Sequence, residues 1–180
     1  MDDLAEYLVN TYSRGGSLEN WSSSLNEEEI VALSKVIQGL SLPLSGNDKI
    51  RILSPASNNA SVEKRLRSAL GDPYQLVCGD IAKLQSGGNI PYLRFDAREA
   101  PFASGSFSLI YDFFGATRYE PRVLEEYFRL LVFRGGVLFD NFTYTDQGTD
   151  AVLKSMGNSF SEPERFSLSD QCEVYFVRRN

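Results

Sequence analysis

The sequence predicts an α/β fold: a seven-stranded, mostly parallel sheet with helices on both faces and an antiparallel strand near the C-terminus. From residue 49 onward, short apolar runs alternate with segments of helical periodicity, and this alternation is typical of parallel strands joined by right-handed crossovers. The last two apolar runs are separated only by residues 169–171. A connection of this length is too short for the crossover that joins parallel strands. The two runs must therefore form a hairpin, with one strand antiparallel.

The first 48 residues are predicted to form a helical N-terminal segment. Leu4 and Leu8 recur at helical spacing, and a second helix starts after Asn26, which can cap it while Glu29 reaches back. Apolar side chains between Ile30 and Leu40 then form one stripe. The segment, residues 1–48, precedes an α/β domain of residues 49–180, and we expect one compact unit.

The α/β domain is predicted from its apolar runs and the turn residues between them. Strands are expected over residues 49–53, 74–78, 92–95, 107–113, 136–140, 165–168 and 173–178. Helices are expected over residues 61–70, 81–85, 121–131 and 150–156.

Composition excludes several classes of function. The chain has 180 residues and no histidine, so a Ser-His-Asp triad, a Cys-His pair and any histidine-ligated metal site are excluded. The net charge of −6 argues against nucleic-acid binding. No run approaches the roughly 20 apolar residues of a membrane helix. We therefore expect no metal, no nucleic-acid partner and no membrane association.

The ends and the cysteines favour a cytoplasmic protein. The chain opens Met1-Asp2-Asp3, which is acidic rather than basic and so unlike a secretory signal. Cys78 and Cys172 lie in apolar runs and form no C-x-x-C pair, so two reduced, buried thiols are expected.

Two segments resemble motifs of the class I S-adenosylmethionine-dependent methyltransferases. Residues 95–111, FDAREAPFASGSFSLIY, are similar to the family's middle segment D-A-x-x-L-P-F-x-D-x-S-F-D-L-V. Residues 124–138, LEEYFRLLVFRGGVL, are similar to L-x-E-x-x-R-V-L-K-P-G-G-x-L with one extra residue before the glycines. The resemblance covers residues 49–180. It implies a Rossmann-like sheet with an antiparallel seventh strand, and S-adenosylmethionine as the cofactor.

The family's first motif, D-x-G-x-G-x-G, is altered in this chain. The corresponding window is residues 54–60, in which Ser54 replaces the acid and Ala56, Asn58 and Ala60 replace the glycines. In the related dinucleotide fold such glycines make a tight turn and let the backbone approach the ligand. The resemblance implies that the missing acid would help to hold the methionine part of the cofactor.

Two interpretations of this loop stay open, because it could still admit the cofactor or could have closed the pocket. An open crevice would lie between Ser54 and Asp80, with the backbone N–H groups of residues 57–60 directed into it. In a closed site, Pro55 and the side chains of residues 58–59 would occupy that space and satisfy the backbone there. The open crevice is the preferred expectation.

Two acids follow strands where the resemblance places the nucleoside of the cofactor. Asp80, after the second strand, would accept hydrogen bonds from the ribose hydroxyls, because two carboxylate oxygens match a vicinal diol. The adjacent Ile81 would pack on the adenine. Asp96, after the third strand, would accept from the adenine amino group, with the backbone of Ala97 beside it. Each acid could instead cap the helix that follows.

Aromatic residues follow the fourth strand, at a strand end that lines the ligand crevice in this architecture. Phe113 and Phe114 would wall the cofactor or substrate, or else belong to the core. Together with Asp112 they do not form D/N-P-P-Y, the family's signature for methylation of amino groups in nucleobases or glutamine.

The N-terminal segment corresponds to the family's variable cap over the substrate. Tyr12, Arg14 and Trp21 are its most ligand-like side chains, with ordinary packing or surface exposure as the alternative.

The leading hypothesis is an S-adenosylmethionine-dependent methyltransferase that acts on a small molecule. A substrate nucleophile would attack the sulfonium methyl in line, with positioning as a large part of the rate. No catalytic residue is assigned. The alternative is a non-catalytic member of the fold, a binding or interaction module: the altered first motif favours it, and Asp80 and Asp96 oppose it. The missing glycines also disfavour an NAD-type dehydrogenase.

Overall fold

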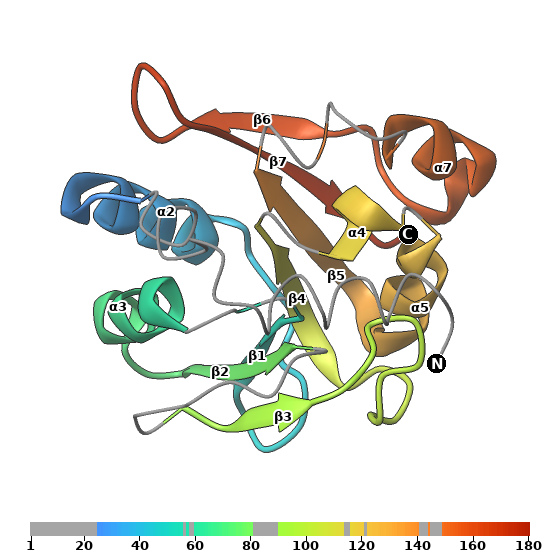
Figure 1. Cartoon of the computed structure of the whole chain (residues 1–180), viewed down its shortest axis with the longest axis horizontal. Helices are drawn as coiled ribbons and strands as arrows, with labels where there is room; N and C mark the ends of the chain where they lie inside the picture. The colour runs from blue at the N-terminus through green and yellow to red at the C-terminus, as the bar shows by residue number, and fades with distance from the viewer. Residues whose placement is uncertain are drawn as a thin grey trace, which may run out of the picture.

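One seven-stranded sheet runs through the molecule (Figure 1). In this computed structural model the strands lie in the order β3-β2-β1-β4-β5-β7-β6. The bounds are β1 Ile50–Ser54, β2 Tyr74–Asp80, β3 Tyr92–Arg94, β4 Phe107–Asp112, β5 Leu131–Asp140, β6 Glu164–Ser167 and β7 Glu173–Arg178. The pairs from β3 to β5 are parallel, whereas β7 is antiparallel to both β5 and β6. The predicted sheet, with its one reversed strand, is confirmed.

The structure describes most of the predicted α/β domain and part of the N-terminal segment. The described residues are 25–55, 57, 60–80, 90–113, 116–120, 122–140, 144 and 149–180. The helix predicted over residues 81–85, and the first 24 residues of the N-terminal segment, lie outside them.

Helices cover both faces of the sheet (Figure 1). Their bounds are α2 Glu27–Gly39, α3 Ser61–Leu70, α4 Ala116–Tyr119, α5 Val123–Leu130 and α7 Thr149–Ser155, with a 3-10 turn over Gly157–Ser159. Buried side chains of α2 and α3 share one core cluster with the sheet, and those of α5 and α7 share a second. The sheet is therefore the middle of three layers.

The capping box predicted for α2 is present. The Glu29 backbone N–H donates to Asn26 Oδ1 and the Asn26 backbone N–H donates to Glu29 Oε2, both at 2.9 Å. Ile30, Leu33 and Ile37 are buried in the same core cluster as side chains of β1 and β2. This helix is thus packed into the core of the α/β domain.

The start of β5 corrects the sequence prediction. β5 begins at Leu131 rather than at residue 136, because Leu131 is extended and already pairs with Phe107. The register then shifts, with Leu109 opposite Gly136, and Arg134 has a φ of 64° between these two pairs. Between these two pairs β5 has three residues more than β4, so the strand is irregular just before the two glycines.

The two cysteines are free thiols. Cys78 is buried in β2, as predicted, whereas Cys172 is only half-buried because it closes the turn between β6 and β7, where its carbonyl accepts from the Leu168 N–H. Within the described ranges, no helix combines the length and apolar character needed to cross a bilayer.

Replacing Gly136 by alanine should destabilise the sheet by about 1–3 kcal/mol. A Cβ at this position would lie 2.3 Å from the Phe176 ring and 2.5 Å from the Val177 carbonyl oxygen, so the β5–β7 pair would have to shift. The matched control is Gly39→Ala at the end of α2, where a Cβ meets nothing within 4 Å; helix propensity should make it neutral or slightly stabilising. Urea unfolding of the two variants measures the difference. Equal stabilities would contradict the antiparallel β5–β7 packing.

Candidate functional site

Polar residues are buried where the central strands end. Ser54 ends β1, Asp80 ends β2, Asp112 ends β4 and Asp140 ends β5, and none is more than 8% exposed. Because these strands are parallel, their carboxyl ends meet at one edge, which is where ligands bind in open α/β sheets. This edge of the sheet is the candidate site.

Ser54 is paired with a buried acid that the sequence analysis did not single out. Its hydroxyl donates to Glu63 Oε1 at 2.7 Å, and Glu63 comes from the first turn of α3. Burial raises the pKa of Glu63 to about 7, with the Asp80 carboxylate adding to the rise and the Ser54 hydroxyl opposing it. Position 54 lacks the acid of the family's first motif, but the Glu63 carboxyl group lies against the end of β1.

The loop after β1 does not direct the expected N–H groups into a crevice. The Ser57 N–H donates to the Gly79 carbonyl at 3.0 Å, and the Ala60 N–H donates to the Ser57 carbonyl at 2.7 Å. The Ser57 hydroxyl donates to the Ser54 carbonyl at 2.7 Å. The expectation that the N–H groups of residues 57–60 face a ligand is therefore wrong for Ser57 and Ala60, because bonds within the chain already use them.

Ala60 occupies a backbone conformation suited to glycine. It lies just before α3 with φ 55° and ψ 25°, the left-handed region, and its side chain is buried. L-residues with a Cβ pay roughly 1–2 kcal/mol there. Position 60 therefore has a backbone conformation that favours glycine, although it carries alanine.

Phe95 connects the two predicted nucleoside acids, because it is hydrogen-bonded to the Asp80 backbone and directly precedes Asp96 in the sequence. The Phe95 N–H donates to the Asp80 carbonyl at 3.0 Å, and the Phe95 ring lies so close to Gly79 that a Cβ there would be 1.9 Å from it. Asp80 is 8% exposed. The Asp96 carboxylate is bound by its neighbour Arg98, with Nε at 3.0 Å from both oxygens and the Arg98 backbone N–H at 2.9 Å from Oδ1.

The remaining described candidates lie in the two core layers. Phe113 is half-buried and stacks on Tyr111, with ring centroids 4.3 Å apart, on the side of α2 and α3. Ala97 is buried in the other layer, in the cluster that includes α5. Ser54, Asp80 and Phe113 therefore border the layer of α2 and α3, whereas Ala97 does not.

Several predicted site residues lie outside the described residues. They are Ala56, Asn58, Ile81 and Phe114 among the cofactor and wall residues, and Tyr12, Arg14 and Trp21 in the N-terminal segment. Their roles stay predictions.

Asp112 is a second buried acid at the edge, on the opposite face from Glu63. Its Oδ2 accepts from the Thr117 N–H at 3.1 Å and from the Thr117 hydroxyl, which links β4 to the start of α4. Burial raises its pKa to about 6, against the lowering effect of these bonds. Within the described residues Oδ1 has no partner of good hydrogen-bond geometry. No three His, Cys, Asp or Glu residues in the described ranges form a cluster that could hold a metal ion.

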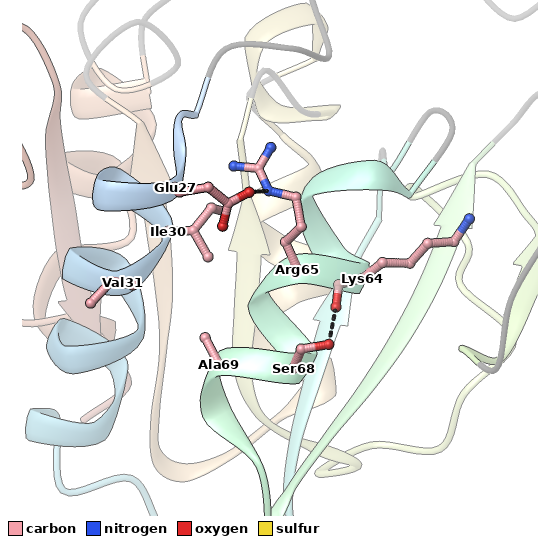
Figure 2. A pocket seen from close by; sticks show the side chains of 7 residues that line it. All are labelled: Glu27, Ile30, Val31, Lys64, Arg65, Ser68 and Ala69. Atoms are coloured by element: carbon pink, nitrogen blue, oxygen red, sulfur yellow. Dashed lines mark hydrogen bonds and ion pairs between the residues drawn. The ribbon is translucent and has the colours of Figure 1, made fainter.

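A separate groove lies between α2 and α3 (Figure 2). Its lining residues are Glu27, Ile30, Val31, Lys64, Arg65, Ser68 and Ala69. Two interactions join polar groups of this lining: Arg65 Nε lies 2.9 Å from Glu27 Oε1, and the Ser68 hydroxyl donates to the Lys64 carbonyl at 3.1 Å. None of the predicted site residues lines this groove.

The fold is shared with solved structures of methyltransferases and of a cyclase. The 1,6-didemethyltoxoflavin-N1-methyltransferase of Burkholderia thailandensis, solved with 1,6-didemethyltoxoflavin and S-adenosylhomocysteine, matches with a TM-score of 0.63 at 10% identity, over 98% of this chain and 87% of that one. The CurJ carbon methyltransferase matches with a TM-score of 0.59 at 13% identity, over 83% and 54%. The [4+2]-cyclase SpnF matches with a TM-score of 0.61 at 11% identity, over 83% and 80%.

These similarities establish the fold. The chain has the class I S-adenosylmethionine-dependent methyltransferase fold, as its motifs predicted. It spans about half of the CurJ methyltransferase structure. No protein-family model and no curated protein matches the sequence.

The buried acids should make the protein less stable as the pH rises. The pKa of Glu63 is about 7 in the folded chain against an ordinary value of 4.5. Between these values the folded state binds more protons than the unfolded state, so stability falls with pH. The raised pKa of Asp112, about 6, lowers the stability in the same direction as the pH rises. Glu63→Gln should remove part of the loss, up to about 3 kcal/mol by pH 8. Thermal unfolding from pH 5 to 8 measures it.

The control for this measurement is Glu125→Gln on the exposed side of α5, which should leave the pH profile as it is in the parent protein. If Glu63→Gln also leaves that profile unchanged, Glu63 does not titrate from a buried position.

Ala60→Gly should stabilise the protein by about 0.5–1 kcal/mol, because glycine adopts the left-handed conformation at little cost. Ala69→Gly provides a matched comparison in the exposed, ordinary helical part of α3, and it should destabilise by about 1 kcal/mol. Urea unfolding should therefore give opposite signs for the same chemical change. A loss of stability in both variants would contradict the strained turn.

Proposed function

We propose that the chain binds S-adenosylmethionine at the carboxyl edge of its sheet and transfers the methyl group to a small molecule. The observation that carries the proposal is the buried polar edge of a methyltransferase-type sheet. There Asp80 ends β2, Ser54 ends the neighbouring strand β1, and Glu63 of α3 accepts the Ser54 hydroxyl. When bound, the cofactor supplies an electrophilic methyl group.

The described residues fit the nucleoside part of this cofactor. Asp80 keeps a carboxylate at the end of the second strand, where its oxygens suit a ribose diol. Asp96 follows the third strand but is already held by Arg98, so it would accept a further donor from an oriented position. Phe113, stacked on Tyr111, supplies an apolar wall. The chain's residues would thus bind and orient the cofactor and exclude water beside it.

A small-molecule acceptor is supported by two observations. Position 112 begins no D/N-P-P-Y motif, and the didemethyltoxoflavin methyltransferase, whose substrate is a small molecule, shares the fold over most of both chains.

A non-catalytic binding module is the second candidate, favoured by the loop after β1. The N–H groups of Ser57 and Ala60 are used within the chain, so these donors are not offered to a ligand. A protein of this kind would bind S-adenosylhomocysteine weakly or not at all and would transfer no methyl group.

Calorimetry with S-adenosylmethionine and S-adenosylhomocysteine tests the proposal. Both should bind, and Asp80→Asn should weaken binding by about 1–3 kcal/mol through the loss of a charged hydrogen-bond acceptor. Asp72→Asn is the matched control: Asp72 lies in the loop before β2, at the opposite edge, and pairs with Lys49. It should leave affinity unchanged. Methyl transfer is then followed with methyl-labelled cofactor and a small-molecule fraction. Absence of binding by the parent protein would refute the proposal.

A further inference from the structure

Glu63 is a buried carboxyl group that forms no ion pair within the described residues. It is 5% exposed and accepts from the Ser54 hydroxyl. A buried carboxylate is normally paired with a positive group, because removing an isolated charge from water is unfavourable. In the described part of the chain this carboxyl group therefore has a hydroxyl partner but no ion-pair partner.

The surroundings of Glu63 are mainly acidic or hydroxylic. The groups that interact with it electrostatically are Asp80 and Cys78 of β2, Tyr92 of β3, Tyr111 of β4 and its own neighbour Lys64. Among these described groups Lys64 carries the one positive charge that acts on Glu63, and Arg65 of α3 acts in the same way on Tyr111. An excess of negative and neutral oxygen atoms around one point is suited to a cationic ligand group.

The Tyr111 hydroxyl is an independent sign of a ligand. Tyr111 is 2% exposed, and its hydroxyl has no hydrogen-bond partner in the described part of the chain. It lies near enough to Glu63 for that carboxyl group to raise the pKa of the phenol. Buried hydroxyl groups normally find partners, so a group with several N–H donors placed between the two residues could donate to the Glu63 carboxylate and to the Tyr111 phenol oxygen.

We infer that Glu63 binds the ammonium group of the amino-acid part of the cofactor, with the Ser54 hydroxyl holding its carboxyl group in place. The inference rests on the function proposed above. It assigns the contact to an acid that comes from α3 rather than from the end of β1. In this arrangement the end of β1 supplies the Ser54 hydroxyl, and α3 supplies the carboxylate of Glu63.

The inference separates ligands that differ in one group. S-adenosylhomocysteine carries the ammonium group, whereas 5′-methylthioadenosine lacks the amino-acid part. Glu63→Gln should weaken S-adenosylhomocysteine binding about 10- to 100-fold, the usual effect of losing a charged hydrogen bond, and should leave 5′-methylthioadenosine binding unchanged. Glu125→Gln, on the other face, should change neither.

Proton release gives a second readout. An ammonium group beside Glu63 favours the ionised form, and the pKa of this group in the free protein is about 7. Binding of S-adenosylhomocysteine at pH 7 should therefore release about 0.5 proton, measured by calorimetry in buffers of different ionisation enthalpy. Glu63→Gln should release none. Ser54→Ala, which removes the hydroxyl that favours ionisation, should release more, and this variant tests the inference if Glu63→Gln does not fold.

The outcomes distinguish the two claims. If the parent protein binds neither nucleoside, the proposed function fails, and this inference fails with it. If it binds both and Glu63→Gln changes neither affinity nor proton release, Glu63 is not the ammonium site although the proposed function stands. Equal weakening of both ligands would also overturn the inference, because it would indicate a structural role.

Discussion

The pairing of β1 with β2 on one side and β4 on the other holds the candidate site together. Leu53 of β1 is in register with Val77 and Ile110, so all three parallel strands end at the same edge. Ser57 then continues the contact between β1 and β2 beyond the strand, through its N–H to the Gly79 carbonyl. The positions of Ser54 and Asp80 follow from this pairing, and Glu63 reaches Ser54 from α3.

The edge also buries acids on both faces of the sheet. Glu63 lies on the side of α2 and α3, and Asp112 lies on the side of α4 and α5. In each case a hydroxyl group donates to the carboxyl group, from Ser54 in one and Thr117 in the other. These bonds lower the pKa values, but burial outweighs them. The acids are therefore poised to change charge near neutral pH, as groups at functional sites often do.

Local patterns were enough to predict the sheet, and they failed where distant residues decide. Apolar runs and a short connection located the strands and the reversed β7, because both signals lie within a few residues. The start of β5 depends on pairing with Phe107, which no local pattern reveals. The internal bonds of Ser57 depend on Gly79, 22 residues away. Asp80 was identified as a candidate because it comes just after the apolar run of residues 74–78, and the structure places it at the end of β2; its role stays a prediction.

Glu63 could not be assigned from the sequence, for a specific reason. An acid in the first turn of a helix is expected there for its favourable interaction with the helix dipole, and it usually faces solvent. Whether it turns toward the sheet depends on the rotation of α3, which is fixed by the burial of Leu66 and Leu70. Glu63 precedes Leu66 by three positions and so shares its face. That spacing is visible in the sequence, but only the structure shows that the Ser54 hydroxyl lies on this face and donates to Glu63.

The chemistry of the edge explains which ligands it suits. Anion sites in related folds present free backbone N–H groups at the start of a helix. Here the N–H groups of Ser57 and Ala60 are bonded within the chain, and Ala60 keeps the turn of a glycine while adding a methyl group. Among the described residues at this end of the loop, Glu63 and Asp80 are the buried acids. Carboxylates repel phosphate and attract cationic groups, so under the function proposed above this edge would suit the ammonium and sulfonium groups of the cofactor better than a dinucleotide.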